Sequence, residues 1–307
     1  MHPAFTWRPN NDVRDLIAMR AFLSAAYRAS ERGLADGLWH PGDMTWAVFL
    51  NSLVGPIDRG DLWFDGAGEL AAIVWRYKGG TEMSIRPNLQ ASTTLTPLLR
   101  AILRRHDDLQ RIAGDPVPLT IGCSEGHATI PAALLSLGCK ADNTDPMTIF
   151  RMDLATTVLP TRVLADGFTL RALAGPADYP DRVAIHREVW APSQVTIDGF
   201  ARLQDMPGYD RALDIVAVAP DGRFAAYCIL WHDPATRSCH FEPVGARKEF
   251  RGRGLASAML VEALRRAQAR GVETAWVYTD EARTAAQALY RSVGFTAVGR
   301  YIGFVRA

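Results

Sequence analysis

The sequence predicts an α+β protein made of two tandem copies of one fold, each a mixed, mostly antiparallel sheet flanked by helices. Three segments recur in the same order, at offsets of 163, 154 and 156 residues: FTWRP (5–9) with FTLRA (168–172), GELAAIVW (68–75) with GRFAAYCILW (222–231), and ALLSLGC (133–139) with LYRSVGF (289–295). One short match would be chance, but three in order favour a duplicated unit. A chain of 307 residues is long enough for two such domains.

The boundary between the copies falls in the segment MDLATTVLPTRVLADG, residues 152–167. A strand ends there, and Pro160 and Gly167 interrupt any regular structure that would follow. We therefore expect a first domain over residues 1–155, a linker over 156–166 and a second domain over 167–307.

Strands in the second copy are expected where β-branched and aromatic residues cluster between turn residues. The Asp221-Gly222 dipeptide predicts a hairpin turn between two of these strands. The expected strands are residues 168–173, 213–220, 224–233, 238–246, 274–280 and 299–307.

Helices in the second copy are expected where apolar residues recur every three or four positions. The clearest case is residues 254–270, which place Leu260 and Leu264 on one face, followed by Gly271 as a suitable left-handed end residue. The other expected helices are residues 177–190, 196–205 and 282–293. Strands with helices packed on them make the α+β class.

Composition excludes several functional classes. The 34 basic and 33 acidic residues leave a net charge of +1, which argues against a nucleic-acid or membrane-surface binder. No apolar run approaches the length of a membrane span, and the start of the chain lacks a signal-peptide pattern. The four cysteines form no CxxC pair, which is typical of reduced thiols in a cytoplasmic protein. The histidines show no metal-binding spacing, so no metal site is expected.

The most informative stretch is FEPVGARKEFRGRGLASAML, residues 241–260, where a strand passes through a glycine-rich turn into a helix. The first amides of a helix have no partner inside the helix, and the helix dipole adds positive potential. Glycines at 252 and 254 let an anion reach those amides, and arginines at 251 and 253 add positive charge. The turn lacks the Lys-Ser/Thr ending of a P-loop and the full GxGxxG pattern. A solvated basic helix start is the plain alternative.

The context of this turn resembles the GNAT acetyltransferase superfamily. RGRGLA (251–256) resembles its [Q/R]-x-x-G-x-[G/A] motif, and ALYRSVGF (288–295) resembles its L-Y-x-x-x-G-F segment, in the family's order and spacing. The resemblance covers residues 168–307 and implies acetyl-coenzyme A as co-substrate. It implies pyrophosphate contacts from the turn and pantetheine contacts from the preceding strand, where two strands splay apart. Gly245 suits the irregular backbone that such a splay needs. The residues concerned are Arg251, Gly252, Arg253, Gly254, Leu255 and Ala256 in the turn, and Val244, Gly245 and Ala246 in the strand. Arg283 departs from the family's frequent asparagine, so its contact with the cofactor is a weaker expectation.

Acetyl transfer to an amine needs a base for the amine and an acid for the leaving thiolate. Tyr290 matches the family's tyrosine and is the expected acid; a core tyrosine under the cofactor is the alternative. His240 and Glu242 lie two apart on a strand and therefore share a face. Either is a candidate base, and each also has a purely structural reading. In residues 189–210, Trp190 and Tyr209 are candidates for an apolar acceptor wall, with core packing as the commoner alternative.

The first copy lacks the chemical residues of the second. Thr93 and Leu95 stand near the two small-residue positions of the turn, and Leu134 takes the place of the tyrosine. We therefore expect a degenerate domain that serves as a scaffold or as one wall of the acceptor site.

The predicted function is N-acetyl transfer from acetyl-coenzyme A to a primary amine of a small molecule or peptide, in the second domain. The protein is expected to act in the cytoplasm as a monomer or homodimer, without nucleic acid or membrane. The alternative is a non-catalytic acyl-coenzyme A sensor or interaction module. O-acetylation and a longer acyl donor also fit the same fold.

Overall fold

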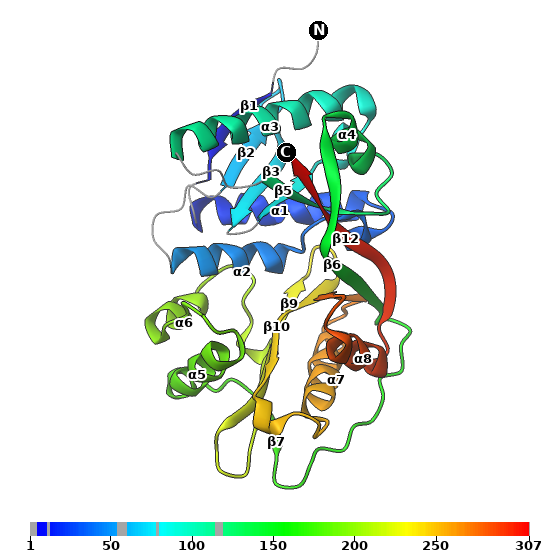
Figure 1. Ribbon diagram of the computed structural model, residues 1–307. Coiled ribbons are helices and arrows are strands. Elements are labelled where there is room, and N and C mark those ends of the chain that lie inside the picture. The colour runs from blue at the N-terminus through cyan, green and yellow to red at the C-terminus, as the bar shows by residue number, and fades with distance from the viewer. Residues whose placement is uncertain (1–4, 11–12, 54–59, 78–79, 114–118, 307) are drawn as a thin grey trace.

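The computed structural model describes residues 5–10, 13–53, 60–77, 80–113 and 119–306 (Figure 1). The first half contains four helices and six strands within these residues. They are β1 (Thr6–Pro9), α1 (Val13–Ala29), α2 (Pro41–Ser52), β2 (Gly60–Phe64), β3 (Leu70–Tyr77), β4 (Gly80–Ile85), α3 (Ser92–Ala113), β5 (Leu119–Ser124), α4 (Ile130–Ser136) and β6 (Cys139–Asp153).

The second half repeats this order of elements, as the internal repeats predict. Its elements are β7 (Thr169–Ala172), α5 (Tyr179–Val189), α6 (Ile197–Leu203), β8 (Asp214–Val218), β9 (Phe224–Asp233), β10 (Ser238–Ala246), α7 (Leu255–Gln268), β11 (Thr274–Asp280), α8 (Thr284–Val293) and β12 (Thr296–Arg306). Strands β9, β10 and β11 span the residues predicted for them. The left-handed glycine after α7 is also confirmed, since Gly271 has a φ value of 77°. Gly294, after α8, has a φ value of 118°.

The described strands form one sheet of twelve, in the order β1-β2-β3-β4-β5-β12-β6-β11-β10-β9-β8-β7. Most neighbours are antiparallel, and the parallel pairs among the described strands are β4–β5 and β10–β11. The α+β class with two tandem units is thus confirmed. The sequence did not predict that the two sheets would be continuous.

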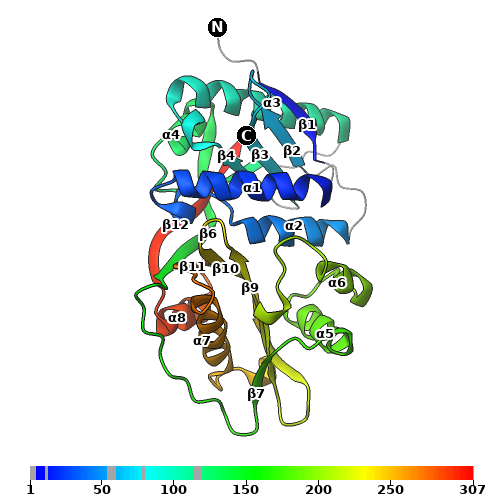
Figure 2. The same ribbon diagram turned by 180° about the vertical axis from the view of Figure 1, so that it is seen from behind.

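The two halves exchange their last strands. Strand β12 of the second half pairs with β5 of the first, from Tyr301 opposite Ser124 to Arg306 opposite Leu119. Strand β6 of the first half pairs with β11 of the second, from Asp153 opposite Thr274 to Met147 opposite Asp280. Strands β6 and β12 also pair with each other, so each half completes the sheet of the other (Figures 1 and 2).

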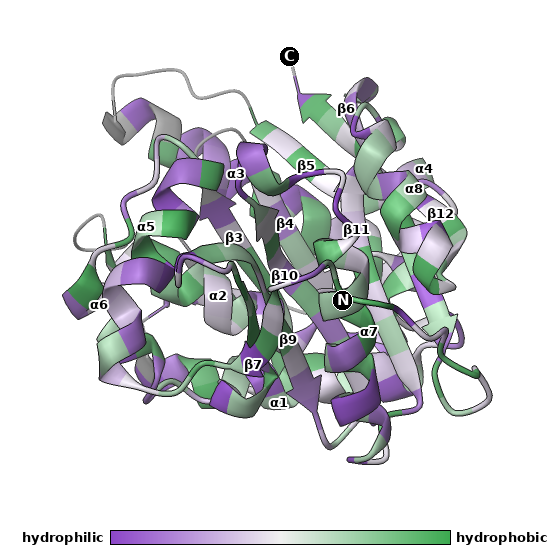
Figure 3. Cartoon of the chain, turned by 90° about the horizontal axis from the view of Figure 1, so that it is seen from below, coloured by the Kyte–Doolittle hydropathy of each residue, from purple (hydrophilic) through white to green (hydrophobic). Residues whose placement is uncertain are grey.

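Helices cover both faces of the sheet. In the second half, α5 and α6 lie on one side of β9 and β10, and α7 and α8 lie on the other (Figure 3). Strand β9 is therefore buried along nearly its whole length. In the first half, α3 and α4 pack on one face of the sheet, while α1 and α2 share a core on the other.

Helix α2 packs against both halves. Its Met44 and Val48 belong to the core that α1 shares with β2 and β3, whereas Trp46 and Phe49 belong to the core beneath α5 and α6. Gly42, near the start of α2, allows a close approach to β9, because a Cβ there would lie 2.1 Å from Cβ of Trp231. Helix α2 therefore brings several first-half side chains to the second half.

The state of the cysteines and the character of the helices bear on the class of protein that the sequence predicts. All four cysteines lie free and buried. Within the described residues, no helix combines the length and the apolar character needed to cross a bilayer.

Candidate active site

The turn before α7 has an open backbone. Gly252 and Gly254 have φ values of 78° and 73°, in the left-handed region that favours glycine. A Cβ built on either glycine would meet no protein atom within 4 Å. The backbone amides of residues 252–257 donate to no acceptor in the described part of the chain. Free amides at an open helix start are the geometry that binds a phosphate.

Strands β10 and β11 separate beside this turn. They pair in parallel from Ser238 opposite Thr274 to His240 opposite Trp276. Farther along, Val244 to Ala246 pair with β9 on one side and have no described strand on the other. That free backbone edge suits an extended ligand that pairs like a strand.

The irregularity in β10 lies elsewhere than expected. The strand bulges between Phe241 and Val244, and is regular at Gly245. A side chain at Gly245 would approach the Tyr227 ring to 2.8 Å and Val189 to 2.9 Å. Glycine is thus required at 245 for packing against α5, rather than for an irregular backbone.

Tyr290 on α8 is buried next to the splay. Its ring packs near Phe150 of β6 and Phe295, at 5.8 and 6.1 Å between ring centroids. Burial and the nearby Glu242 charge raise the pKa of Tyr290 well above its usual value. The phenol therefore keeps its proton at neutral pH, as a general acid must. Phe150 belongs to the exchanged strand, so the first half supports the position of this tyrosine.

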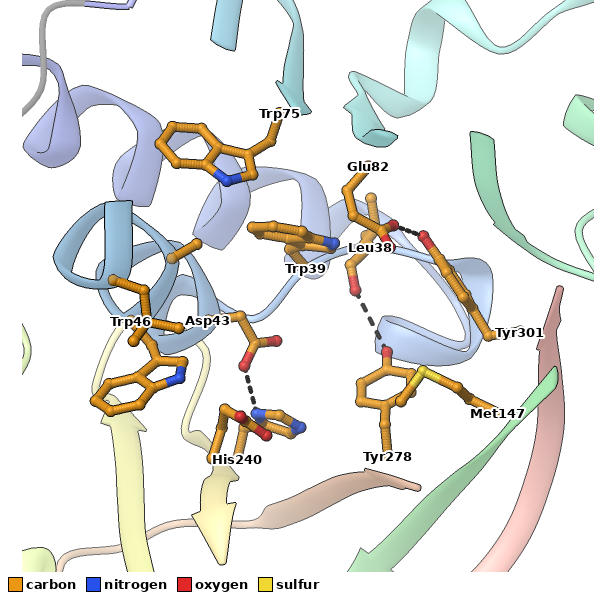
Figure 4. Close-up of a pocket in the computed structure, with 13 residues that line it drawn as sticks. Leu38, Trp39, Asp43, Trp46, Trp75, Glu82, Met147, His240, Tyr278 and Tyr301 are labelled. Carbon is orange, nitrogen blue, oxygen red and sulfur yellow. Dashed lines mark hydrogen bonds and ion pairs between the residues drawn. The ribbon is translucent and has the colours of Figure 1, made fainter. Parts of the chain in front are cut away.

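His240 and Glu242 both face one cavity, as their spacing predicts, and a first-half carboxylate joins them. Asp43 on α2 forms an ion pair with His240, at 2.5 Å between Oδ1 and Nδ1 (Figure 4). Burial alone would lower the pKa of His240, but the charges of Asp43 and Glu242 raise it. Burial raises the pKa of Glu242 to about 7, with Asp43 adding to the rise and His240 opposing it. A carboxylate with this pKa is suited to accept a proton near neutral pH.

The cavity lies between the two halves and has a volume of about 340 Å³. Its walls are mainly aromatic and aliphatic, with three carboxylates and one histidine, and no lysine or arginine among the described lining residues. These residues are Leu38, Trp39, Asp43, Trp46, Ala47, Leu50, Trp75, Glu82, Met147, His240, Glu242, Tyr278 and Tyr301 (Figure 4). A pocket of this composition favours a positively charged ligand.

The sequence around this site is similar to that of a known protein family. Residues 182–295 match the model of the acetyltransferase (GNAT) family. The second half of this chain is therefore similar to a GNAT domain over these residues. A mycothiol acetyltransferase of Thermobispora bispora is 30% identical over 179 residues, which cover 55% of this chain and 60% of that relative. The chain thus spans less than two thirds of the relative's length.

Solved structures with the same fold cover nearly the whole chain. A tandem GNAT protein from the clavulanic acid biosynthesis pathway has a TM-score of 0.66 at 14% identity, covering 98% of both chains. A GCN5-related N-acetyltransferase from Sphaerobacter thermophilus has a TM-score of 0.65 at 20% identity, covering 100% of this chain and 96% of that one. The fold shared with these structures therefore extends over both halves.

The first half differs from the GNAT domain at the matching positions. At the start of α3, the amides of Thr94 and Leu95 both donate to the Ala91 carbonyl, so they are occupied within the chain. Leu95 and Leu134 are fully buried in the core of the first half. Where the GNAT domain has an open turn and a tyrosine, the first half has packed leucines.

Other expected residues lie apart from the cavity. Arg283 is more than half exposed, with its guanidinium 5.2 Å from the Trp190 ring and 3.8 Å from Asp280. Tyr209 donates a hydrogen bond to Asp214. Neither Trp190 nor Tyr209 lines the cavity, because α2 takes that place. Asp43 was missed, since nothing near it in the sequence marks it as a partner of His240.

Proposed function

We propose that this protein transfers the acetyl group of acetyl-coenzyme A to a primary amine, in the cavity between its two halves. The observation that carries the proposal is the convergence of three features at the β10–β11 splay. These are the open amides before α7, the Tyr290 phenol, and the His240–Glu242 pair that faces an acidic cavity.

The residues of the GNAT domain divide the binding of acetyl-coenzyme A between them. The amides from Gly252 to Ala256, with Arg251 and Arg253 beside them, suit the pyrophosphate. The free edge of Val244 to Ala246 suits the amides of the pantetheine arm. The thioester of acetyl-coenzyme A would then lie where β10 and β11 separate, between Tyr290 and the cavity.

The proton transfers follow from the charge states of the site. The acceptor enters as an ammonium ion, because free alkylamines have a pKa of roughly 10. Glu242 or His240 takes one proton, directly or through water, and the neutral nitrogen attacks the thioester carbonyl. The C–N bond forms, the C–S bond breaks, and Tyr290 protonates the leaving thiolate. The base passes its first proton to solvent, then takes the second proton from the nitrogen and returns that proton to Tyr290.

The test combines binding and turnover. Calorimetry with acetyl-coenzyme A is expected to show one site per chain, and a thiol-release screen over amines is expected to find an acceptor. Tight binding with no thiol release from any amine, amino acid, aminoglycoside or peptide would favour a sensor instead. Absence of binding would overturn the proposal.

A further inference from the structure

A histidine caps the start of helix α2. His40 precedes the first helical residue, Pro41, and its carbonyl accepts a hydrogen bond from the Met44 amide at 3.3 Å. Its Nδ1 accepts a hydrogen bond from the Gly42 amide at 3.0 Å, which gives a partner to an amide that a helix start leaves free. In return, the His40 amide donates to Oδ2 of Asp43 at 3.2 Å. This reciprocal arrangement is a capping box in which histidine takes the usual place of serine or threonine.

The cap holds one oxygen of the Asp43 carboxylate and leaves the other for the candidate base. Oδ2 accepts from the His40 amide, while Oδ1 forms the ion pair with Nδ1 of His240 (Figure 4). The direction of this carboxylate therefore depends on the geometry of the helix start.

The His40 ring also connects the start of α2 to the strand that carries His240. It is inaccessible to solvent, and because Nδ1 accepts a hydrogen bond, the hydrogen of the neutral ring lies on Nε2. Nε2 donates to Oγ of Ser238 at 3.2 Å. Ser238 lies in β10 two residues before His240, so both are on the same face of the strand.

The partners of Ser238 require the same form of the His40 ring. Ser238 Oγ lies 2.7 Å from Oγ1 of Thr236, which lies 2.8 Å from Oδ2 of Asp233. A carboxylate accepts, so Thr236 donates to Asp233 and Ser238 donates to Thr236. The Ser238 oxygen is then left to accept from His40. Burial, with the charges of His240 and Arg20, lowers the pKa of His40 well below its usual value, so the ring stays neutral.

We propose that His40 is a positioning residue for acetyl transfer, which aims the Asp43 carboxylate at His240 by capping α2 and bonding to β10. This inference rests on the proposed function. The described residues that line the cavity do not include His40, and its ring centroid lies 5.8 Å from that of His240. Its effect on the chemistry therefore passes through Asp43.

The groups around His240 give this effect a definite sign. In the described structure they are Asp43 on α2, Glu242 on the same strand, His40, and Tyr278 of β11 at 5.4 Å between ring centroids. His40 and Tyr278 are neutral, so replacement of His40 removes no charge. Displacement of the Asp43 carboxylate lowers the pKa of His240, whereas entry of water would raise it, because burial lowers it.

The test measures the pKa of His240 by NMR of labelled imidazole rings, which does not depend on activity. His40→Ala and His40→Ser leave nearly the same space, and both lose the ring that bonds to Ser238. Only serine can accept a hydrogen bond from the Gly42 amide. We expect the pKa of His240 to fall by about one pH unit in His40→Ala and to stay closer to that of the parent in His40→Ser.

Two control variants are expected to leave the pKa of His240 as it is. Val48→Ala weakens the packing of α2 in the core that it shares with α1, away from the cap. Asp166→Asn removes an exposed carboxylate that does not line the cavity.

A double variant shows whether His40 acts through Asp43. In the Asp43→Asn background, His40→Ala is expected to cause no further fall in the pKa of His240, because the carboxylate that it positions is gone. The kcat/KM profile of His40→Ala is expected to move in the same direction as that of Asp43→Asn.

The parent protein alone provides a measurement that stands if His40→Ala does not fold. Its His40 ring is expected to be neutral at neutral pH, with the hydrogen on Nε2. A hydrogen on Nδ1 overturns the inference. So does an unchanged pKa of His240 in His40→Ala, an equal fall in His40→Ser, or a further fall in the double variant, while acetyl transfer stands. Failure to bind acetyl-coenzyme A overturns the proposed function and leaves these NMR results as they are.

Discussion

Asp43 links the charge state of the candidate bases to the first half of the chain. It contacts His240 directly, and its charge raises the pKa of both His240 and Glu242. Either base must be deprotonated to work, so activity is expected to rise with pH through the pKa of the base, which for Glu242 is about 7.

Replacement of Asp43 by asparagine is expected to lower the pKa of both candidate bases, because a negative neighbour is removed. The acidic limb of the kcat/KM profile should then move to lower pH by about one pH unit. The measurement is a pH profile of Asp43→Asn against the parent, with Asp166→Asn as the control. If the acidic limb of the profile stays at the same pH, the charge of Asp43 does not raise the pKa of the working base.

Tyr290→Phe removes the candidate acid while the ring packing against Phe150 and Phe295 remains. We expect kcat to fall by roughly a hundredfold or more, with little change in the affinity for acetyl-coenzyme A. Steady-state kinetics and calorimetry on the same preparation test both parts. Turnover equal to that of the parent would mean that Tyr290 has only a packing role.

Residue roles could be predicted only where the information is local. His240 and Glu242 were found because a strand's alternation places both on one face. Asp43 lies far away along the chain and reaches His240 through the packing of α2 on β9, which no short pattern encodes. The same reason explains why the described residues that line the cavity include four from α2 and none from 189–210.

At the scale of elements, the turn before α7 provides a clean test of anion binding. Gly254→Asp and Gly254→Asn place side chains of nearly equal shape at a left-handed position that both residues tolerate. Only the aspartate adds negative charge next to the free amides. We expect the aspartate variant to lose affinity for acetyl-coenzyme A at least tenfold relative to the asparagine variant.

Calorimetry with both Gly254 variants separates charge from shape. Equal affinities for the two would contradict a phosphate at this turn. Circular dichroism of both is the control for folding.

Helix α5 is fixed to β8 by a buried ion pair. Arg182 Nε lies 3.1 Å from Asp214 Oδ1, and both side chains are almost inaccessible to solvent. Arg182→Met leaves the Asp214 carboxylate unpaired and is expected to reduce the free energy of unfolding by about 3–5 kcal/mol. Adding Asp214→Asn removes the stranded charge and should recover most of this loss. Urea unfolding of the single and double variants measures the free energy of unfolding of each. If both variants lose the same amount, the unpaired charge of Asp214 is not the cause.

Individual elements were predictable because their signals are local. Glycines with positive φ end α7 and α8, and β10 and β11 span the residues predicted from composition and turns. An irregular backbone in β10 was expected at Gly245, but the bulge lies between Phe241 and Val244. A glycine can be needed either for an irregular backbone or for close packing of a neighbouring side chain. The sequence alone does not show which of these applies at Gly245.

At the scale of the whole molecule, the strand exchange makes each half depend on the other. Strand partners are chosen by long-range pairing, and β6 and β12 carry no local signal for which sheet they join. The sequence therefore predicted two units but not their exchange.

A protease site placed within residues 156–166 tests this dependence. The segment is accessible, since Val158 and Val163 are 94% and 91% exposed. After cleavage we expect the fragments to elute together in gel filtration and to separate only in denaturant, because β6 and β12 hold them in one sheet. The uncut protein with the same insertion is the control. Fragments that separate without denaturant would contradict the exchange.

The exchange also restricts how this chain can change over generations. A gene that lost its first half would encode a GNAT domain without the strand beside β11, without Phe150 behind Tyr290, and without Asp43. Substitutions in the first half can therefore remove residues that bind a ligand while the protein still folds. A deletion of the whole first half would instead abolish the function of the second. A duplicated domain that lost its catalytic residues would then be retained, because the other domain needs it to fold.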